Sequence, residues 1–202
     1  AQASGESARE IVPVSVPGKR GAVEVALDEE PGKSDLDKLP QLKPAFQNPG
    51  SIPAGNASKI NAGAAAVILA SAAACKARGL RPLARITHYA NHAQAPVDFP
   101  TAPVYAIQKA LARAQLTAAD IDLYEINEAF AVVALACIKL AQLDPERVNV
   151  RGGAVALGHP IGASGARILT TLLYAMQERD ARRGLATLCI GGGEANALIV
   201  ER

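Results

Sequence analysis

The chain has 202 residues, long enough for one large domain or two small ones, and half of them are hydrophobic, which excludes a chain that is disordered throughout. Because 21 Lys and Arg residues stand against 19 Asp and Glu, the formal net charge of +2 is too balanced to indicate a nucleic acid or a membrane surface as a partner. Aromatic residues make up only 3%, which excludes the stacking platforms of a protein that binds single-stranded nucleic acid.

The N-terminal part of the chain predicts a small hairpin, a long loop and one helix. Alternating apolar and polar residues around Gly18 and Gly21 predict two short strands within residues 10–25. Five prolines without a regular apolar period indicate a loop region over residues 28–58. Residues 60–79 are rich in alanine and end in a basic turn followed by glycine. We expect a helix there, buried between layers because its side chains are small.

From residue 81 onward, strands and helices alternate. Thr117 is expected to cap a short turn between a helix and a strand. The expected strands are 82–89, 122–126 and a closing pair within 185–202, and the expected helices are 104–114, 127–140 and about 164–179. This order predicts an α/β fold of about 120 residues, with a mixed sheet and helices on both faces.

The cysteines, the histidines and the apolar pattern bear on metal binding and compartment. Cys75, Cys137 and Cys189 are an odd number at wide spacing without a CxxC pair, which argues against a disulfide framework or a zinc site. His88 and His92 have no third ligand nearby, so no metal site is expected. Apolar stretches end well before the roughly 20 residues of a membrane span, and the N-terminus lacks a secretory pattern. We expect a cytoplasmic protein without a membrane partner, with a mitochondrion or another organelle as the alternative.

Three segments carry polar or reactive residues where a predicted strand or its loop ends, which is where open α/β sheets assemble their sites. They are NEAFA at residues 127–131, GHPIGASG at 158–165 and CIGGG at 189–193. The second segment matches neither a dinucleotide loop nor a P-loop, and no acidic residue follows at the ribose spacing. A nucleotide-dependent oxidoreductase is therefore disfavoured.

Each segment admits a catalytic and a structural interpretation. Cys189 ends an apolar run before three glycines, so it is either a thiol beside backbone N–H groups that can bind an oxyanion, or a buried core cysteine. His159, flanked by glycine and proline, either accepts a thiol proton and donates to an oxyanion, or bonds backbone carbonyls in a turn. Asn127 either holds a water or substrate oxygen or, with Glu128, begins a helix.

Together and in this order, the three segments resemble the C-terminal half of the thiolases, the family of acetyl-CoA acetyltransferases and 3-ketoacyl-CoA thiolases. AGNAS at residues 54–58 is similar to the family's coenzyme A loop, and EIVPV at 10–14 to the start of its loop-domain strands. The resemblance implies a thiolase-like layered α/β fold, of which the C-terminal half and part of the loop domain are present. It implies the remainder of the loop domain at 1–58, the last part of the N-terminal domain at 59–80 and the C-terminal domain at 81–202.

The resemblance also implies roles for named residues. Cys189 matches the cysteine that exchanges the α-proton of acetyl-CoA, and His159 matches the histidine that activates the nucleophilic cysteine and shares the oxyanion hole for the enolate. Asn127 would hold the water that completes this hole, and Gly191 would offer a backbone N–H to a second one. The residues that would bind coenzyme A are Ala54, Ser58, Ile60, Ala129 and Phe130.

These residue types fit a Claisen condensation, which needs a base at the α-carbon and fixed donors where enolate charge develops. A cysteine exchanges that proton at modest cost where its pKa, ordinarily ~8.5, is lowered locally. The substrate implied is acetyl-CoA or a 3-ketoacyl-CoA, with no covalently bound cofactor. The family also implies a homodimer or a homotetramer.

The sequence departs from the family at several positions. Nothing matches the surroundings of the family's nucleophilic cysteine, and Cys75 lies in the alanine-rich stretch. We therefore expect an acyltransferase fragment that is inactive without the missing N-terminal half; the alternative is a non-catalytic coenzyme A-binding or interaction module. The chain resembles the potassium-binding acetoacetyl-CoA thiolase branch, but Pro31 replaces a tyrosine near the ion and argues against potassium. Lys59 and Arg151 are either ligands of a coenzyme A phosphate or, for the lysine, a solvated side chain.

Overall fold

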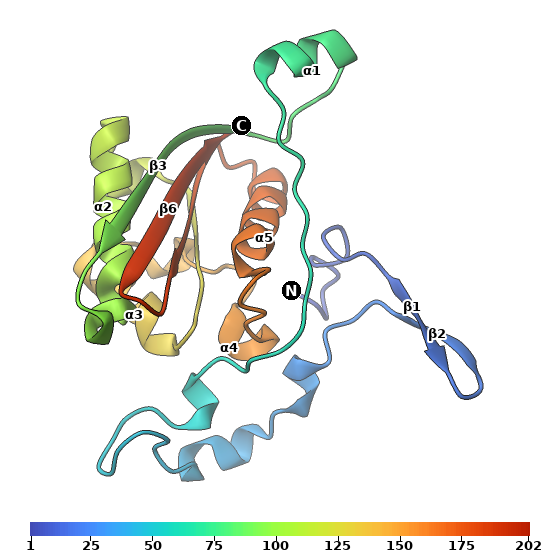
Figure 1. Ribbon diagram of the computed structural model, residues 1–202, viewed down its shortest axis with the longest axis vertical. Coiled ribbons are helices and arrows are strands. Elements are labelled where there is room, and N and C mark those ends of the chain that lie inside the picture. Colours follow the sequence, from blue (N-terminus) through green and yellow to red (C-terminus); the bar gives the residue numbers. More distant parts are fainter.

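A four-stranded mixed sheet organises the second half of the chain in the computed structural model, which describes residues 1–202 (Figure 1). Its strands lie in the order β3 (Arg85–Ala93), β6 (Glu194–Glu201), β5 (Arg183–Cys189) and β4 (Leu123–Ile126). β4 and β5 are parallel, whereas β6 pairs antiparallel with both β3 and β5. The mixed sheet expected from the order of elements is therefore confirmed.

Helices cover both faces of this sheet, as the sequence predicts (Figure 1). α2 (Ala102–Ala114) and α3 (Ala131–Leu140) pack on one face, where Tyr124 and Ile199 belong to the larger buried cluster. α5 (Ser164–Glu178) packs on the other, where Leu172 and Val200 belong to a second cluster. Because side chains alternate between the two faces of a strand, neighbouring residues of β4 and β6 enter different clusters. The sheet is thus the layer that separates two cores.

Short 3₁₀ turns connect the regular elements. In the turn Ala118–Asp120, the Thr117 backbone N–H and hydroxyl donate to the Asp120 carboxylate at 2.8 and 2.7 Å, so the predicted cap at Thr117 is confirmed. The other turns span Glu30–Lys33, Leu36–Gln41, Ala54–Asn56, Pro96–Thr101 and Pro145–Arg147. No helix in the chain is both long and apolar enough to cross a bilayer.

An N-terminal arm extends away from this layered body (Figure 1). β1 (Val14–Gly18) and β2 (Gly21–Val25) form the predicted antiparallel hairpin, and every residue of both strands is exposed. The long proline-rich segment that follows contains only 3₁₀ turns, as expected for a loop. Just before the hairpin, the arm is held to α5 because the Thr171 hydroxyl donates to Glu10 at 2.6 Å and Arg9 stacks on the Tyr174 ring at 5.2 Å.

The prediction of a buried helix over residues 60–79 is wrong. Only α1 (Ala72–Arg78) is helical, capped by the Ser71 hydroxyl and ended by Gly79 in the left-handed conformation at φ 63°. The preceding residues run as an extended, largely exposed segment, in which Ile68 is 94% exposed (Figure 1). Short helices in water owe most of their stability to tertiary contacts, and no layer of this chain covers the alanine-rich stretch.

The prediction of a helix from Asn127 is also wrong at its start, because α3 begins at Ala131 with Phe130 as its N-cap. The Asn127 backbone N–H instead donates to the Thr187 carbonyl at 3.0 Å and continues the pairing of β4 with β5. Asn127 therefore caps no helix, and the interpretation of its side chain as an N-cap is wrong. A short helix, α4 (Ala154–Leu157), interrupts the glycine-rich segment and was not expected.

Candidate functional site

The centre of the candidate site is a contact between Asn127 and His159, at the end of β4 and in the loop between α4 and α5. The Asn127 Nδ2 atom lies 3.4 Å from the His159 Nε2 atom, and Asn127 is fully buried. Two of the segments that the sequence singles out, 32 residues apart, thus meet through their polar side chains. The Asn127 Oδ1 atom is buried without a hydrogen-bond partner, so this amide has acceptor capacity left.

Ser164, which the sequence analysis missed, holds the other nitrogen of the ring. The His159 Nδ1 atom lies 2.6 Å from the hydroxyl oxygen of Ser164, the fully buried first residue of α5. That hydroxyl donates its proton to the Pro160 carbonyl at 3.1 Å, so its oxygen accepts from Nδ1–H. This pattern assigns the neutral tautomer whose Nε2 is unprotonated and accepts from Asn127.

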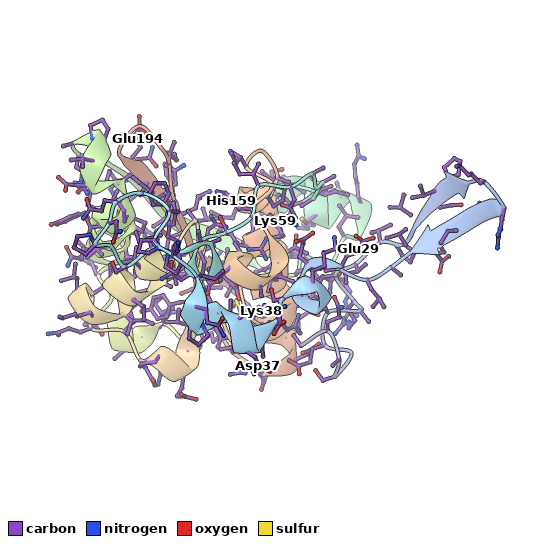
Figure 2. The ribbon with its side chains drawn as sticks, turned by 90° about the horizontal axis from the view of Figure 1, so that it is seen from below. Glu29, Asp37, Lys38, Lys59, His159 and Glu194 are labelled. Atoms are coloured by element: carbon purple, nitrogen blue, oxygen red, sulfur yellow. The ribbon has the colours of Figure 1, made fainter.

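The backbone around His159 is fixed by close contacts with a distant segment. The His159 N–H donates to the Lys59 carbonyl at 2.8 Å, and the two residues are neighbours in Figure 2. Gly158 has φ 94°, a backbone conformation that residues other than glycine rarely adopt. A Cβ at this position would lie 2.2 Å from the Asn61 amide nitrogen. A Cβ at Gly63 would likewise lie 2.8 Å from the Pro160 ring. Glycine is therefore required where residues 59–63 cross the histidine loop.

The surroundings of His159 favour its neutral form. Burial of the ring is the main cause that lowers the pKa of His159 below its usual value, and the positive charge of Arg167 on α5 lowers it further. The imidazole is therefore uncharged near neutral pH, as a group that accepts a proton must be.

Glu128, which the sequence places beside Asn127, organises the loop and α4 instead of binding a ligand. Its carboxylate accepts from the Asn149 amide at 2.9 Å and from the Val155 backbone N–H at 3.1 Å, at the start of α4. A Cβ at Gly153 would fall within 2.3 Å of this carboxylate, so only glycine fits there. Asn149 also bonds both backbone groups of Ile126, at 2.7 and 2.9 Å, and so extends the end of β4.

Cys189 ends β5, as predicted, but its side chain is a buried one. It is 6% exposed, belongs to the core cluster beneath α2 and α3, and makes no hydrogen bond to Asn127 or His159. Burial raises the pKa of the Cys189 thiol to about 11. The sequence-based condition of a locally lowered pKa is therefore not met in this chain, and the thiol is protonated at neutral pH.

The glycines after Cys189 form the tight turn between β5 and β6. The Ile190 N–H donates to the Glu194 carbonyl at 2.8 Å, and the Gly193 N–H donates to the Ile190 carbonyl at 3.1 Å. Gly193 has φ 98°, and a Cβ there would lie 2.3 Å from the Gln94 carbonyl oxygen. Gly191 is exposed at the tip of this turn, and its N–H makes no backbone hydrogen bond.

Three of the five residues that the resemblance assigns to coenzyme A come together. The Ser58 hydroxyl and N–H both donate to the Ala129 carbonyl, at 2.8 and 3.0 Å, and Ala57 forms a bridge with Phe130. The loop of residues 54–58 therefore lies against the NEAFA segment. The two others are less enclosed, since Ala54 is exposed in its 3₁₀ turn and Ile60 is 79% exposed beside the histidine loop.

The two basic residues considered for a coenzyme A phosphate differ in their surroundings. Lys59 is exposed and pairs with Glu30 at 2.8 Å. Arg151 is buried and bridges Glu10 and Glu178, which join the N-terminal arm to α5. Arg151 is thus occupied by structural ion pairs, whereas Lys59 is an exposed side chain that pairs with one carboxylate.

The two other cysteines, Cys75 and Cys137, lie in helices. Cys75 lies in α1, which Figure 1 shows beyond one end of α5, while α4 and the histidine loop lie at the other. Cys137 is buried in α3, and burial raises its pKa to about 12. Neither thiol is a hydrogen-bond partner of the His159 ring, whose partners are Asn127 and Ser164.

Two family models match the chain, one over each part of it. A family model described as "Thiolase, C-terminal domain" matches residues 80–202, and one described as "Thiolase, N-terminal domain" matches residues 1–73. The probable acetyl-CoA acetyltransferase of Dictyostelium discoideum is 51% identical over 203 residues, which cover 100% of this chain and 49% of that protein.

Solved structures give the same result. The Bacillus anthracis acetyl-CoA acetyltransferase superposes with a TM-score of 0.95 at 44% identity, and an Ascaris suum thiolase in complex with coenzyme A with a TM-score of 0.90 at 43% identity. In both, the match covers 100% of this chain and 51% of the other. The chain thus spans about half the length of the relatives that it matches.

Proposed function

Because the chain belongs to the thiolase family, we propose that it supplies His159, Asn127 and Cys189 to the reversible Claisen condensation and thiolysis of a 3-ketoacyl-CoA, with acetoacetyl-CoA as the first candidate. The observation that carries this proposal is the hydrogen-bonded series from Asn127 through His159 to Ser164. A neutral ring with a fixed tautomer suits both a proton acceptor and, once protonated, a donor to an enolate oxygen.

The three residues divide the proton transfers. His159 Nε2 accepts the proton of the nucleophilic thiol, and the resulting N–H then donates to the thioester oxygen as enolate charge develops. Asn127 acts on the same oxygen through its amide or a water. Cys189 exchanges the α-proton; its raised pKa keeps the thiol protonated, which is the form that gives a proton to the enolate carbon in the cleavage direction.

The substrate is a coenzyme A thioester, and no covalently bound cofactor takes part in the proposed reaction. The contact of Ser58 with Ala129 supports a pantetheine path along residues 54–58, and one of the superposed structures is a thiolase in complex with coenzyme A. Lys59 is the basic residue on this path with an ammonium group accessible to a phosphate. Its exchange for alanine tests this contact by the affinity for coenzyme A.

The nucleophilic cysteine is proposed to come from a second polypeptide portion equivalent to the remaining half of the relatives. The part of the sheet that α5 leaves uncovered supports such a partner. A groove of about 340 Å³ lies there, lined by Tyr89 on β3, Leu198 on β6 and Leu169 on α5 among others. The exposed apolar segment around Ile68 lies on this side as well (Figure 1). Buried apolar area is the main favourable term in association.

Thiolysis of acetoacetyl-CoA by the 202-residue chain, alone and joined to the first half of the Bacillus anthracis relative, tests the proposal. We expect no turnover from the chain alone and restored turnover from the fusion. His159→Asn in the fusion should reduce kcat by at least 100-fold, while Lys76→Ala, an exchange in α1, should leave it unchanged. Turnover by the purified chain alone, or by the His159→Asn fusion, would contradict the proposal.

A non-catalytic coenzyme A-binding module is the second candidate, because the Ser58–Ala129 contact needs no second half. Calorimetry with coenzyme A on the chain alone separates the two. Binding without restored turnover in a folded fusion favours the module.

We further propose a homodimer or homotetramer in the cytosol; one relative of this chain carries "cytosolic" in its name.

A further inference from the structure

Two ionisable side chains, Glu125 and Arg167, take no part in the proposed proton transfers. Tyr124 and Ile126 belong to the larger core cluster on the α2 and α3 side of β4. Because side chains alternate along a strand, Glu125 between them lies on the α5 side, as Leu123 does. Arg167 follows Ser164 by three residues on α5, so both lie on one side of that helix. Because α5 packs on β4, the two residues lie on neighbouring elements.

Glu125, Arg167 and Asn127 each carry a buried side-chain polar atom without a hydrogen-bond partner. Glu125 is 2% exposed, and its Oε1 atom is buried without a hydrogen bond. The Nε atom of Arg167 and the Oδ1 atom of Asn127 are buried and unpaired too. Most buried polar groups in folded proteins have partners, so these three atoms need an explanation beyond packing.

The positive charge of Arg167 acts on both His159 and Glu125. It opposes protonation of His159, after the larger effect of burial. Burial raises the pKa of Glu125 to about 8, and Arg167 only partly offsets this rise. The other charged groups that act on Glu125 are Glu10 and Glu128, which disfavour its ionised form, and Arg151, which favours it.

We propose that Glu125 and Arg167 are positioning residues that add to the effect of burial in keeping His159 a neutral imidazole. A protonated Glu125 leaves the positive charge of Arg167 uncompensated, and that charge keeps a second proton off the ring. If Glu125 were ionised, it would neutralise Arg167 and stabilise the imidazolium instead. The catalytic consequence rests on the proposed function, but the protonation of His159 can be measured without turnover.

Nuclear magnetic resonance titration of the 202-residue chain tests the role of Arg167. The chain has three histidines, so the His159 signal can be identified by its loss in His159→Gln. We expect Arg167→Gln to raise the midpoint of His159 by about half a pH unit, and Arg167→Lys, which keeps the charge, to leave it near the wild-type value. Arg179→Gln, at the other end of α5, is the control without a shift. An unchanged midpoint in Arg167→Gln, or equal shifts in both Arg167 variants, would overturn the proposal.

Glu125→Gln tests the state of the carboxyl independently. The amide has the size and neutrality of a protonated carboxyl, so the midpoint of His159 should stay unchanged. A lower midpoint would mean that Glu125 is ionised while His159 titrates, and it would refute the proposed arrangement. Backbone amide spectra of each variant establish that it is folded.

The same variants in the active fusion connect the inference to turnover. The acid limb of the pH profile of kcat/KM should move upward in Arg167→Gln by the shift measured for the ring, and it should not move in Arg167→Lys. If the titration midpoint of His159 shifts but no fusion turns over substrate, only the proposed function is refuted. If the fusion is active and its acid limb stays in place although the midpoint of His159 has shifted, the positioning role is refuted.

Discussion

At the scale of single residues, the hydroxyl of Ser164 decides how His159 can act. By accepting from Nδ1–H it leaves Nε2 as the unprotonated nitrogen, which can take up a proton, and its own proton goes to a backbone carbonyl. The residue lies five positions after His159, at the first turn of α5, so the loop and the helix start form one unit. The serine in GHPIGASG is therefore explained by its hydrogen bonds to the ring and the backbone, and not only by its small size.

Glu125 makes the stability of the chain depend on pH. Its pKa in the folded chain, about 8, lies above the ordinary carboxyl value, so the folded state holds a proton that the unfolded state has released between about pH 5 and pH 8. The free energy of unfolding is therefore highest below this range and falls as the pH rises through it, by an amount on the order of a few kcal/mol. Urea unfolding from pH 5 to pH 9 measures the slope.

Glu125→Gln should remove this contribution, because an amide does not titrate. The difference in free energy of unfolding between variant and wild type should grow in favour of the variant as the pH rises towards 9. Equal slopes for the two proteins would show that the carboxyl is not buried in its neutral form.

At the scale of elements, Gly153 and Glu128 join α4 to the end of β4. The carboxylate accepts from the first turn of α4 and occupies the space that a side chain at Gly153 would need. The glycine-rich segment is therefore shaped at this point by a carboxylate of the protein itself. Its later part, at Gly158, is shaped by the crossing of Asn61.

Gly153→Ala should cost about 1–3 kcal/mol in free energy of unfolding, because the new methyl group would meet the Glu128 carboxylate. In a Glu128→Ala background the cost should be clearly smaller, which a double-mutant cycle in urea would measure. Gly162→Ala serves as the control, since nothing lies within 4 Å of the added Cβ. An equal cost in both backgrounds would exclude the steric explanation.

At the scale of the whole molecule, the chain combines a well-buried body with long exposed segments. Both strands of the hairpin are exposed throughout, and the segment before α1 is extended with Ile68 in solvent. Solvent-exposed backbone with few apolar contacts opens readily, which makes it a target of proteases. Both segments lie beyond α5 as seen from the sheet (Figure 1).

Limited proteolysis with elastase should therefore cleave the chain alone within residues 60–71 before it cleaves the body from residue 85 onward. In the fusion with the first half of a relative, the same segment should resist cleavage, because the added portion would cover its apolar side chains. Mass spectrometry of the first fragments locates the cut. Cleavage of this segment at the same rate in a folded, active fusion would show that the second half does not cover it.

The sequence by itself determined the sheet, the helices that cover it and the identity of the site segments. Alternating and helical apolar patterns located β4, β5, β6, α2 and α5, because these elements bury their apolar faces within the chain. The prediction failed for residues 60–71. Their many small side chains are typical of a buried helix, but no layer of this chain covers them.

Only the tertiary structure decided the chemistry of the site. Whether Asn127 caps a helix or faces His159 depends on its pairing with β5, which no local signal contains. The partner of the ring, the neutral carboxyl of Glu125 and the raised pKa of Cys189 depend on what is buried beside them. Hydrogen bonds and burial are set by residues that are distant in sequence, so local propensity can name the candidates but cannot assign their protons.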